Sequence, residues 1–346
     1  KAIEEGCWFS QETADKFLQF VDSFLIHTTG ALAGQPFKLL PWQVEDLTDL
    51  FGWVKDNELH PEGNPVRRYT HAYIEIPKKN GKTTIASAIL LYLLCADNEA
   101  NAKVFTAAIT RKQSAMCMET AMLMAKASPD LADVIRIYAS KNSMKCYLNN
   151  GTAETMSNEA ENQEGVDASG MVIDELHAHK TRKLYDCLIY AGIAREQPLT
   201  IVITTAGVHD PNSIGWEVHR QGEDIIGNVS DNTSFFARIY SANIKTDDLA
   251  KKDTWYKCNP SLGHTLKLSD FKKDFEHAKK YPSAWSAFCR YRLNIWTNVS
   301  DAWMPLQDVI ERKDAGCGDL DSFRDKERVD RTVVGIDLAH SKDLAC

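Results

Sequence analysis

The strongest chemical signal in the chain is a short run of glycine, lysine and threonine between two apolar segments. The run N-G-K-T-T at residues 80–84 follows an alternating, aromatic and β-branched stretch at 69–76 and precedes an apolar stretch at 85–95. A strand that passes through such a loop into a helix is the context of a phosphate-binding loop, where backbone N–H groups and the helix dipole hold phosphate oxygens. Lys82 is predicted to reach the β- and γ-phosphates of a nucleotide, and Thr83 to supply an oxygen to Mg²⁺.

This loop departs from the standard pattern G-x-x-x-x-G-K-T, because Ile76 stands where the pattern has glycine. The run P-K-K at 77–79 supplies a rigid entry and extra positive charge instead. Since G-K-T also occurs by chance at helix starts, the flanking strand and helix support the functional interpretation. The residues predicted to bind ATP here are Lys79, Asn80, Gly81, Lys82, Thr83 and Thr84.

The second motif is acidic and follows the phosphate loop by about 90 residues. The apolar run at 170–173 ends in Asp174 and Glu175, which a buried strand would carry to the rim of a sheet. Asp174 is predicted to hold Mg²⁺ through water, and Glu175 to polarise the attacking water as a general base. His177 and His179 lack the H-E-x-x-H spacing of a metal pair, so we expect surface or supporting histidines.

Two further motifs carry weaker predictions. Thr204 and Thr205 end another buried strand, where their hydroxyls either sense the γ-phosphate or only cap a turn. Gln43 offers both a donor and an acceptor and is a candidate for hydrogen bonding to an adenine edge.

The elements that must position these residues alternate along the chain. Strands are predicted at 69–76, 103–108, 134–139, 145–148, 153–157, 171–173 and 200–205, and helices at 13–27, 42–54, 85–95 and 111–127. Residues 240–300 are predicted to be mostly helical. Strands alternating with helices indicate an α/β fold with a mainly parallel sheet.

Composition excludes several classes of protein. The 346 residues are 44% apolar and 25% charged, which is typical of globular proteins and not of disordered chains. A net charge of −8 argues against a general polycation that coats nucleic acid. Apolar runs stop short of the roughly 18–20 residues of a membrane span. The nine cysteines include no C-x-x-C pair, which favours reduced thiols in a cytosolic protein.

One segment departs from the acidic balance. Residues 240–300 contain 11 Lys or Arg and 6 Asp or Glu, a net charge of +5. The pairs at 251–252, 272–273 and 279–280, together with Arg290 and Arg292, are candidates for contact with DNA phosphates, although at least half of them are expected only to solvate helix faces. An acidic, polar stretch at 313–331 is predicted to be a linker.

The motifs together form an ordered set that resembles the large terminase subunit of tailed double-stranded-DNA phages. The set comprises L-P-W-Q at 40–43, the loop at 77–84, D-E-L-H at 174–177, I-T-T-A-G at 203–207, N-P-S-L-G at 259–263, F-x-x-x-R-L-N-x-W at 288–296 and V-G-I-D-L-A at 334–339. The resemblance extends over nearly the whole chain.

The resemblance implies a P-loop NTPase of the catalytic-glutamate type. Its expected parts are an N-terminal helical region with the adenine motif at 1–65, the ATPase core at 66–240, a helical linker or lid subdomain at 241–325, and the first strand of an RNase H-like nuclease at 326–346. Asp337 would be the first ligand of the two divalent metal ions of that nuclease, either Mg²⁺ or Mn²⁺. Because the other ligands would follow Cys346, we expect this chain to stop inside a domain and not to cut DNA.

The resemblance also implies a role for each motif residue. Gln43 would contact adenine, and Lys78 would face the γ-phosphate as a catalytic residue, without the planar fork of the more usual arginine. Thr204 and Thr205 would form the coupling motif. A neighbouring subunit of a ring motor would supply a transition-state arginine, for which Arg195 is the first candidate and Arg182 the second.

The implied function is a motor that hydrolyses ATP with Mg²⁺. It would drive viral double-stranded DNA through a portal protein into a procapsid, and its nuclease would cut concatemeric DNA into genome units. The implied setting is a ring of about five subunits with a small terminase subunit, in the host cell cytoplasm and without a membrane. Two alternatives stay open: a superfamily 2-type helicase with a second RecA-like domain after residue 240, and a non-enzymatic nucleotide-binding module.

Overall fold

The computed structural model describes residues 1–58, 60–108, 111–156, 166–179 and 182–297. The predicted nuclease strand at 326–346, its Asp337 and the linker predicted at 313–331 lie outside the described residues.

A single large sheet is the centre of the described chain. Its strand order is β11-β4-β10-β9-β5-β8-β7-β6. The six strands from β11 to β8 are parallel, and β7 and β6 extend the edge in antiparallel pairs. The bounds are β4 His71–Glu75, β5 Lys103–Ala107, β6 Ile135–Tyr138, β7 Ser143–Cys146, β8 Thr152–Met156, β9 Gly170–Asp174, β10 Leu199–Thr204 and β11 Phe235–Ile239. The predicted α/β fold with a mainly parallel sheet is confirmed.

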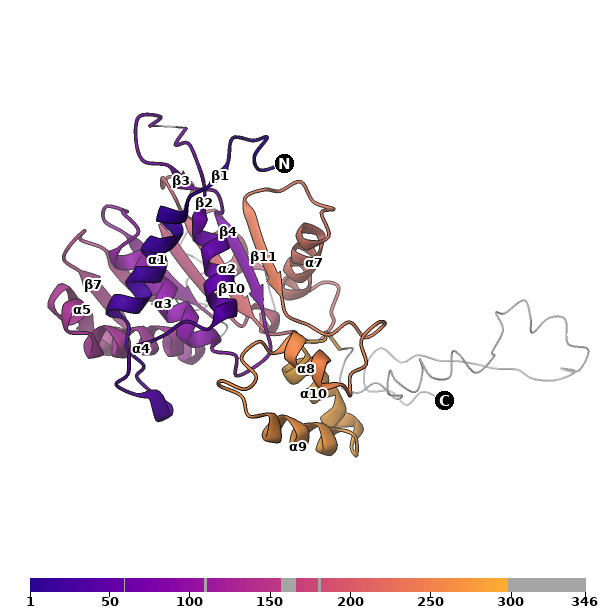
Figure 1. Ribbon diagram of the computed structural model, residues 1–346. Helices are drawn as coiled ribbons and strands as arrows, with labels where there is room; N and C mark the ends of the chain where they lie inside the picture. Colours follow the sequence, from indigo (N-terminus) through magenta and orange to yellow (C-terminus); the bar gives the residue numbers. More distant parts are fainter. Residues whose placement is uncertain (59, 109–110, 157–165, 180–181, 298–346) are drawn as a thin grey trace, which may run out of the picture. The chain divides into compact units, whose positions relative to one another are not determined.

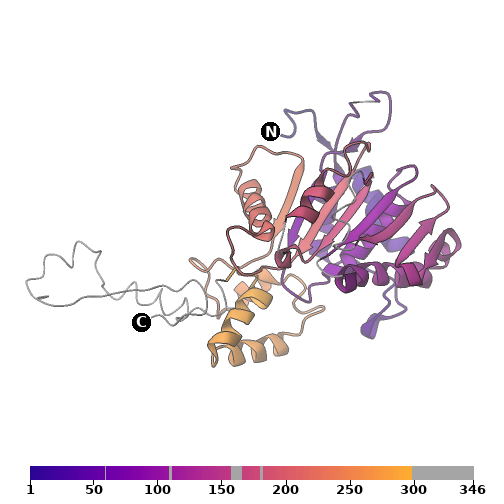
Figure 2. The ribbon, with the colours of Figure 1, turned by 180° about the vertical axis from the view of Figure 1, so that it is seen from behind.

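Helices cover both faces of this sheet (Figures 1 and 2). The alternation of side chains along β4 separates two apolar cores, because Ala72 and Ile74 enter one and Tyr73 the other. The first core receives α1 (Gln11–Phe24), α2 (Pro41–Gly52), α3 (Lys82–Cys95), α4 (Arg111–Ala127) and α5 (Pro129–Val134), and the second receives α6 (Lys183–Ile189) and α7 (Ile214–Ile226). Because these strands are covered on both faces, their sequences are nearly continuous apolar runs.

The helix after the predicted phosphate loop is buried on nearly every side. Of its 14 residues, 11 are buried, so α3 shows no apolar stripe and behaves as a core helix. It contacts α4 and strands of the sheet. This burial fixes the position of its first turn, where the loop ends.

A separate helical unit follows the last strand. It consists of α8 (Lys252–Cys258), α9 (Leu268–Ala278) and α10 (Pro282–Leu293), and we call residues 252–293 the helical subdomain. Aromatic side chains build its own core, among them Trp255, Phe271, Phe275 and Phe288. Up to residue 297, this region contains no second α/β unit of the kind that a helicase would need.

The structure also adds elements that periodicity did not indicate. A small antiparallel sheet joins β1 (Trp8–Phe9) and β2 (Trp53–Lys55), which lie in the region predicted to be helical, to β3 (Val66–Arg67) just after it. The helix predicted at 42–54 therefore ends at Gly52, because the next residues pair with other strands. β11 and α7 were not predicted as separate elements. Among the described residues, no helix combines the length and the apolar character that crossing a bilayer would require.

Candidate active site

The predicted phosphate loop connects β4 to α3 at the carboxyl edge of the sheet. Gly81 is the N-cap of α3 and has a φ of 87°, a left-handed conformation that favours glycine. Lys79 also has a positive φ, of 73°. The chain thus turns sharply and presents the first N–H groups of α3, which have no partner within the helix. This backbone arrangement suits a phosphate group.

Lys82 ties this loop to the end of β10. Its side chain is buried, and Nζ donates to the carbonyl oxygens of Ile76 at 2.9 Å and Pro77 at 3.3 Å and to Oγ1 of Thr205 at 2.5 Å. Burial lowers the pKa of the Lys82 ammonium, and the carboxylates of Glu175 and Asp174 oppose that shift. The cation therefore lies between the loop, the acidic motif and the predicted coupling motif.

The acidic motif lies at the end of β9, between β10 and β5. Burial, with the charge of Glu175, raises the pKa of Asp174 to about 6. Burial also acts to raise the pKa of Glu175, but contact with His177 and the charge of Lys82 outweigh it, so that pKa is lowered. Glu175 is thus a carboxylate at neutral pH, the state that a general base needs.

The backbone directs Glu175 out of the strand. Its φ of 53° and ψ of 47° place it in the left-handed region, where non-glycine residues are uncommon and mark sites that the surrounding structure holds in place. Its N–H donates to the carbonyl oxygen of Ile203 at 3.1 Å. In the described part of the chain, no donor meets the buried Oε2 of Glu175 with hydrogen-bond geometry. This oxygen can accept a proton from a bound water.

His177 lies between Glu175 and the coupling motif. Its Nδ1 is 3.0 Å from Oε2 of Glu175 and 3.0 Å from Oγ1 of Thr204. Its backbone N–H also donates to that hydroxyl, at 3.2 Å. Thr204 and Thr205 are both buried, and His177 contacts Thr204 while Lys82 contacts Thr205. The structure therefore brings the loop, the acidic motif and the coupling motif together.

The second histidine is not at the surface. His179 is 6% exposed, and burial lowers its pKa to about 4. Of the two settings expected for the histidines, surface or supporting, a surface position does not hold for His179, which directly follows the 3₁₀ turn Leu176–Ala178. Among the described residues, no group of three or more His, Cys, Asp or Glu could hold a metal.

The oxygen donors at this site suit magnesium bound with a nucleotide. Mg²⁺ prefers hard oxygen ligands and is held by one or two carboxylates together with substrate phosphates, without an all-protein cage. Thr83, half-buried in the first turn of α3, and Asp174 offer such oxygens. Thr84 is half-buried in the same turn. The donor set therefore fits the expected ion.

Gln43 approaches the loop from α2. Its side chain is buried, and Oε1 accepts from the backbone N–H of Leu40 at 2.8 Å, which caps the helix. Its Nε2 lies 3.5 Å from the position that a Cβ on Gly81 would take. The tertiary structure thus brings this residue beside the phosphate loop, and its role toward adenine stays a prediction.

The helical subdomain holds the other side of the loop. Asn80 is fully buried, donates through Nδ2 to Oδ1 of Asn259 at 3.0 Å, and accepts at Oδ1 from the N–H of Ser261 at 3.2 Å. The ammonium of Lys78 lies 3.8 Å from the ring centroid of Tyr291 in α10. The backbone N–H of Lys78 donates to the backbone carbonyl of Tyr291. Lys78 is therefore stacked on this subdomain, and a role toward the γ-phosphate remains a prediction.

Sequence reasoning missed a buried glutamate directly before the loop. Glu75 is the last residue of β4, is fully buried, and accepts hydrogen bonds from His219 Nδ1 at 2.9 Å and from Trp296 Nε1 at 3.0 Å. Tyr73 and Asn294 donate to it as well. An acidic residue inside an apolar strand was the available signal, because burial of a carboxylate requires such partners.

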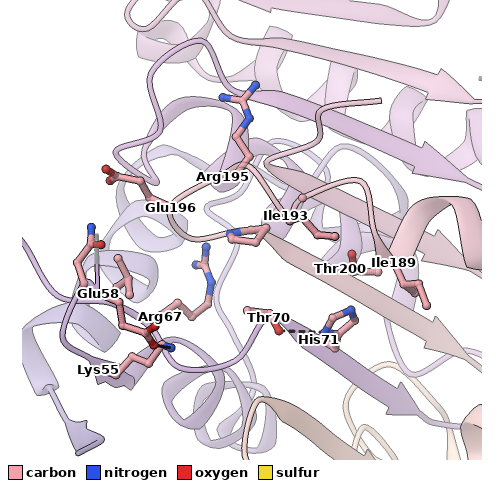
Figure 3. A pocket seen from close by; sticks show the side chains of 14 residues that line it. Lys55, Glu58, Arg67, Thr70, His71, Ile189, Ile193, Arg195, Glu196 and Thr200 are labelled. Carbon is pink, nitrogen blue, oxygen red and sulfur yellow. Dashed lines mark hydrogen bonds and ion pairs between the residues drawn. The ribbon is translucent and has the colours of Figure 1, made fainter. Parts of the chain in front are cut away.

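The two arginines proposed for trans action lie in different settings. Arg195 lies by the amino-terminal ends of β4 and β10, away from its own phosphate loop, on a pocket of about 410 Å³ (Figure 3). Its side chain is 11% exposed and bonds Asp167 at 2.7 Å. Arg182 is 56% exposed and follows the acidic motif by seven residues, with its guanidinium near Asp186 and Glu217.

Several of the basic residues at 240–300 have acidic neighbours. Lys251, Lys273 and Lys279 each lie within 3.9 Å of a carboxylate on their own helix or the turn before it. Arg292 donates to Asp274. These contacts favour the interpretation that these four residues solvate helix faces and do not contact DNA phosphates.

Comparison with known proteins places these observations in a family. A family model described as "Terminase large subunit, ATPase domain" matches residues 41–220, and one described as "Terminase large subunit, endonuclease domain" matches 229–346. The domain boundaries predicted at 240, 241 and 325 stay predictions. Strand β11 pairs with β4 in the large sheet, although its residues lie in the range matched by the endonuclease model.

Two relatives and one solved structure are similar to this chain. The large terminase subunit of Enterobacteria phage HK97 is 27% identical over 283 residues, 81% of this chain and 52% of that protein. Protein YmfN of Escherichia coli K12 is 26% identical over 173 residues, 50% of this chain and 36% of that protein. The crystal structure of the HK97 large terminase matches the fold with a TM-score of 0.69 at 24% identity, and covers 82% of this chain and 55% of that one. The chain spans about half the length of the HK97 relative.

Proposed function

This chain belongs to the terminase large subunit family, and from that premise we propose that it hydrolyses ATP to ADP and phosphate at the site described above. One observation carries the proposal: buried Lys82 bonds both the phosphate loop and Thr205 while lying beside the Asp174 and Glu175 carboxylates. A structural nucleotide site has no need of an ionised, buried carboxylate next to the phosphate loop.

Each residue then has a defined task. Lys82 and the first N–H groups of α3 bind the β- and γ-phosphates, and Glu175 takes a proton from the attacking water through Oε2. Thr83 and Asp174 would hold Mg²⁺, which when bound neutralises charge on the phosphates. Gln43 and the neighbouring residues Lys79, Asn80, Gly81 and Thr84 orient the nucleotide, with Gln43 on the adenine side.

The structure changes the order of the two candidates for the arginine that a neighbouring subunit would supply. Arg182 becomes the first candidate, because more than half of its side chain is exposed and it follows Glu175 by only seven residues. Arg195 becomes the second, because its guanidinium is enclosed by Asp167 and Glu99. Lys78 contributes positive charge near the site in its own subunit.

The role of the intact protein extends beyond this chain. We infer that the intact protein is a ring motor of about five subunits, which drives viral double-stranded DNA through a portal protein into a procapsid in the host cytoplasm. A small terminase subunit is its expected partner. A nuclease with two divalent metal ions and Asp337 among its ligands would cut the DNA. Family membership and the two matched domain models support this inference.

The test is steady-state ATP hydrolysis by this chain over a series of protein concentrations with MgCl₂. We expect activity that rises more than linearly with concentration, because a neighbouring subunit completes the site. Glu175→Gln should lower kcat at least about 100-fold and still bind ATP, since loss of a general base costs about 10²–10⁴-fold. The matched control is Glu154→Gln in β8, an exposed carboxylate remote from the loop.

Two results would contradict the proposal. ATP binding without hydrolysis at every concentration, with portal protein and DNA also present, would indicate a structural nucleotide site. Activity that is linear in concentration, is stimulated by single-stranded DNA and separates strands would indicate a helicase.

A further inference from the structure

One side chain joins the end of the coupling strand to the helical subdomain. Asn294 follows α10 as its C-cap, has a φ of 57° and is 1% exposed. Its Oδ1 accepts from the N–H of Ala206 at 2.7 Å, and its Nδ2 donates to Oε1 of Glu75 at 3.1 Å and to the Tyr240 carbonyl at 3.0 Å. This amide therefore uses its acceptor for the coupling strand and its donors for the core of the sheet.

The partners of Asn294 are themselves held in place. Glu75 also accepts from Tyr73, His219 and Trp296, so its carboxylate is fixed in a buried network. A fully satisfied polar network in a low-dielectric interior is rigid. Glu75 is thus a rigidly held partner for Asn294. Helices α8 and α10 lie by the carboxyl ends of β4 and β11 (Figure 1).

The coupling side of the contact leads directly to the phosphate loop. Ala206 follows Thr205, whose hydroxyl accepts from Nζ of Lys82 at 2.5 Å. If Lys82 binds phosphate, as the proposed function requires, it must change partners, and the Thr205 hydroxyl loses its donor. The next peptide N–H, on Ala206, is the one bonded to Asn294. Lys82, Thr205, Ala206 and Asn294 thus form a continuous chain of contacts.

We propose that Asn294 is the positioning residue through which the nucleotide state of the coupling strand reaches the helical subdomain, residues 252–293. The inference rests on the proposed function for its ligand. Asn294 touches neither nucleotide nor water and acts through Ala206. Its left-handed backbone suits asparagine or glycine, so its side chain can be removed without forcing a new backbone conformation.

The experiment is hydrogen–deuterium exchange of the full chain with and without ATP-γ-S and MgCl₂. In the parent chain, nucleotide should protect residues 77–84 and change exchange in α8–α10. In Asn294→Gly, protection at 77–84 should persist, and the response of α8–α10 should fall about fivefold or more, the lower end of typical couplings between sites.

The matched control is Asn228→Gly, which changes an exposed left-handed asparagine after α7 and should leave the response intact. If Asn294→Gly does not fold, Asn294→Ser replaces it, because a shorter side chain cannot span both partners. An undiminished response of α8–α10 in the glycine variant would overturn the inference, as would the absence of any response there in the parent chain. No protection at 77–84 in the parent chain would refute the nucleotide site itself.

Discussion

Oε2 of Glu175 lies 3.0 Å from Nδ1 of His177, and the same nitrogen lies 3.0 Å from Oγ1 of Thr204. The imidazole therefore supports the proposed base on one side and contacts the coupling strand on the other. Because Glu175 occupies a left-handed backbone conformation, its side chain depends on such neighbours for its direction.

Replacing His177 should reduce the rate of hydrolysis more than the affinity for nucleotide. We expect His177→Ala to lower kcat about tenfold, which corresponds to about 1.4 kcal/mol of lost positioning, and to leave the Kd for ATP within about twofold. Steady-state kinetics and nucleotide titration measure the two quantities. His264→Ala, an exposed substitution, is the control, and an unchanged kcat in His177→Ala would show that Glu175 needs no support from this residue.

Complementation should identify the trans arginine. Arg182→Ala and Glu175→Gln chains should each be inactive when assembled alone, with Arg182→Ala at least about 10³-fold below the parent chain. A one-to-one mixture should recover activity, because Glu175→Gln chains supply Arg182 to intact Glu175 sites of their neighbours. Recovery with Arg195→Ala in place of Arg182→Ala would reverse the assignment, and no recovery in either mixture would exclude both residues.

The buried ion pair between Arg67 of β3 and Asp97 should dominate local stability. Arg67 and Asp97 form two hydrogen bonds, at 3.0 and 2.8 Å, with both side chains almost fully buried. Asp97→Ala should lower the free energy of unfolding by about 3–5 kcal/mol, because it leaves the guanidinium buried without a counter-charge. Urea unfolding measures this loss.

An exposed pair provides the comparison. Glu276→Ala removes the partner of Lys279, with both side chains more than half exposed, and should change stability by less than about 1 kcal/mol. A double variant, Arg67→Met with Asp97→Leu, should be more stable than Asp97→Ala alone. Equal losses for Asp97→Ala and Glu276→Ala would contradict the interpretation.

Asp46 should make stability depend on pH between about 4 and 6. Burial raises its pKa to about 6, in spite of the Tyr240 hydrogen bond and the charge of Arg238, while Glu45 adds to the rise. Below pH 6 the folded chain binds a proton that the unfolded chain, with its ordinary pKa, does not bind. The contribution of Asp46 to stability is therefore fully present below the unfolded pKa and is lost as pH rises through 6.

Asp46→Asn isolates this effect, because the amide does not titrate. The unfolding free energy of the parent chain relative to Asp46→Asn should increase as pH falls from 7 to 4, by up to about 3 kcal/mol. Urea unfolding at several pH values measures the difference. A difference that stays constant with pH would show that Asp46 keeps an ordinary pKa in the folded chain.

The amino-acid sequence by itself determined the fold class and the motifs. Continuous apolar runs such as 170–173 predicted buried parallel strands, and the positions of Lys82 and Glu175 after strands predicted a common edge. These predictions succeed because strand periodicity and strand-to-helix order are local properties. The matched family models agree with the resemblance drawn from the same motifs.

Only the tertiary structure decided which neighbours complete those motifs. Glu75 and Asn294 have partners from segments far apart along the chain, and Asn294 contacts both residue 75 and residue 206. No local pattern specifies such contacts, because they depend on how the helical subdomain and the sheet pack. For the same reason, sequence position placed Arg195 ahead of Arg182, whereas their burial and ion pairs differ in the folded chain in favour of Arg182.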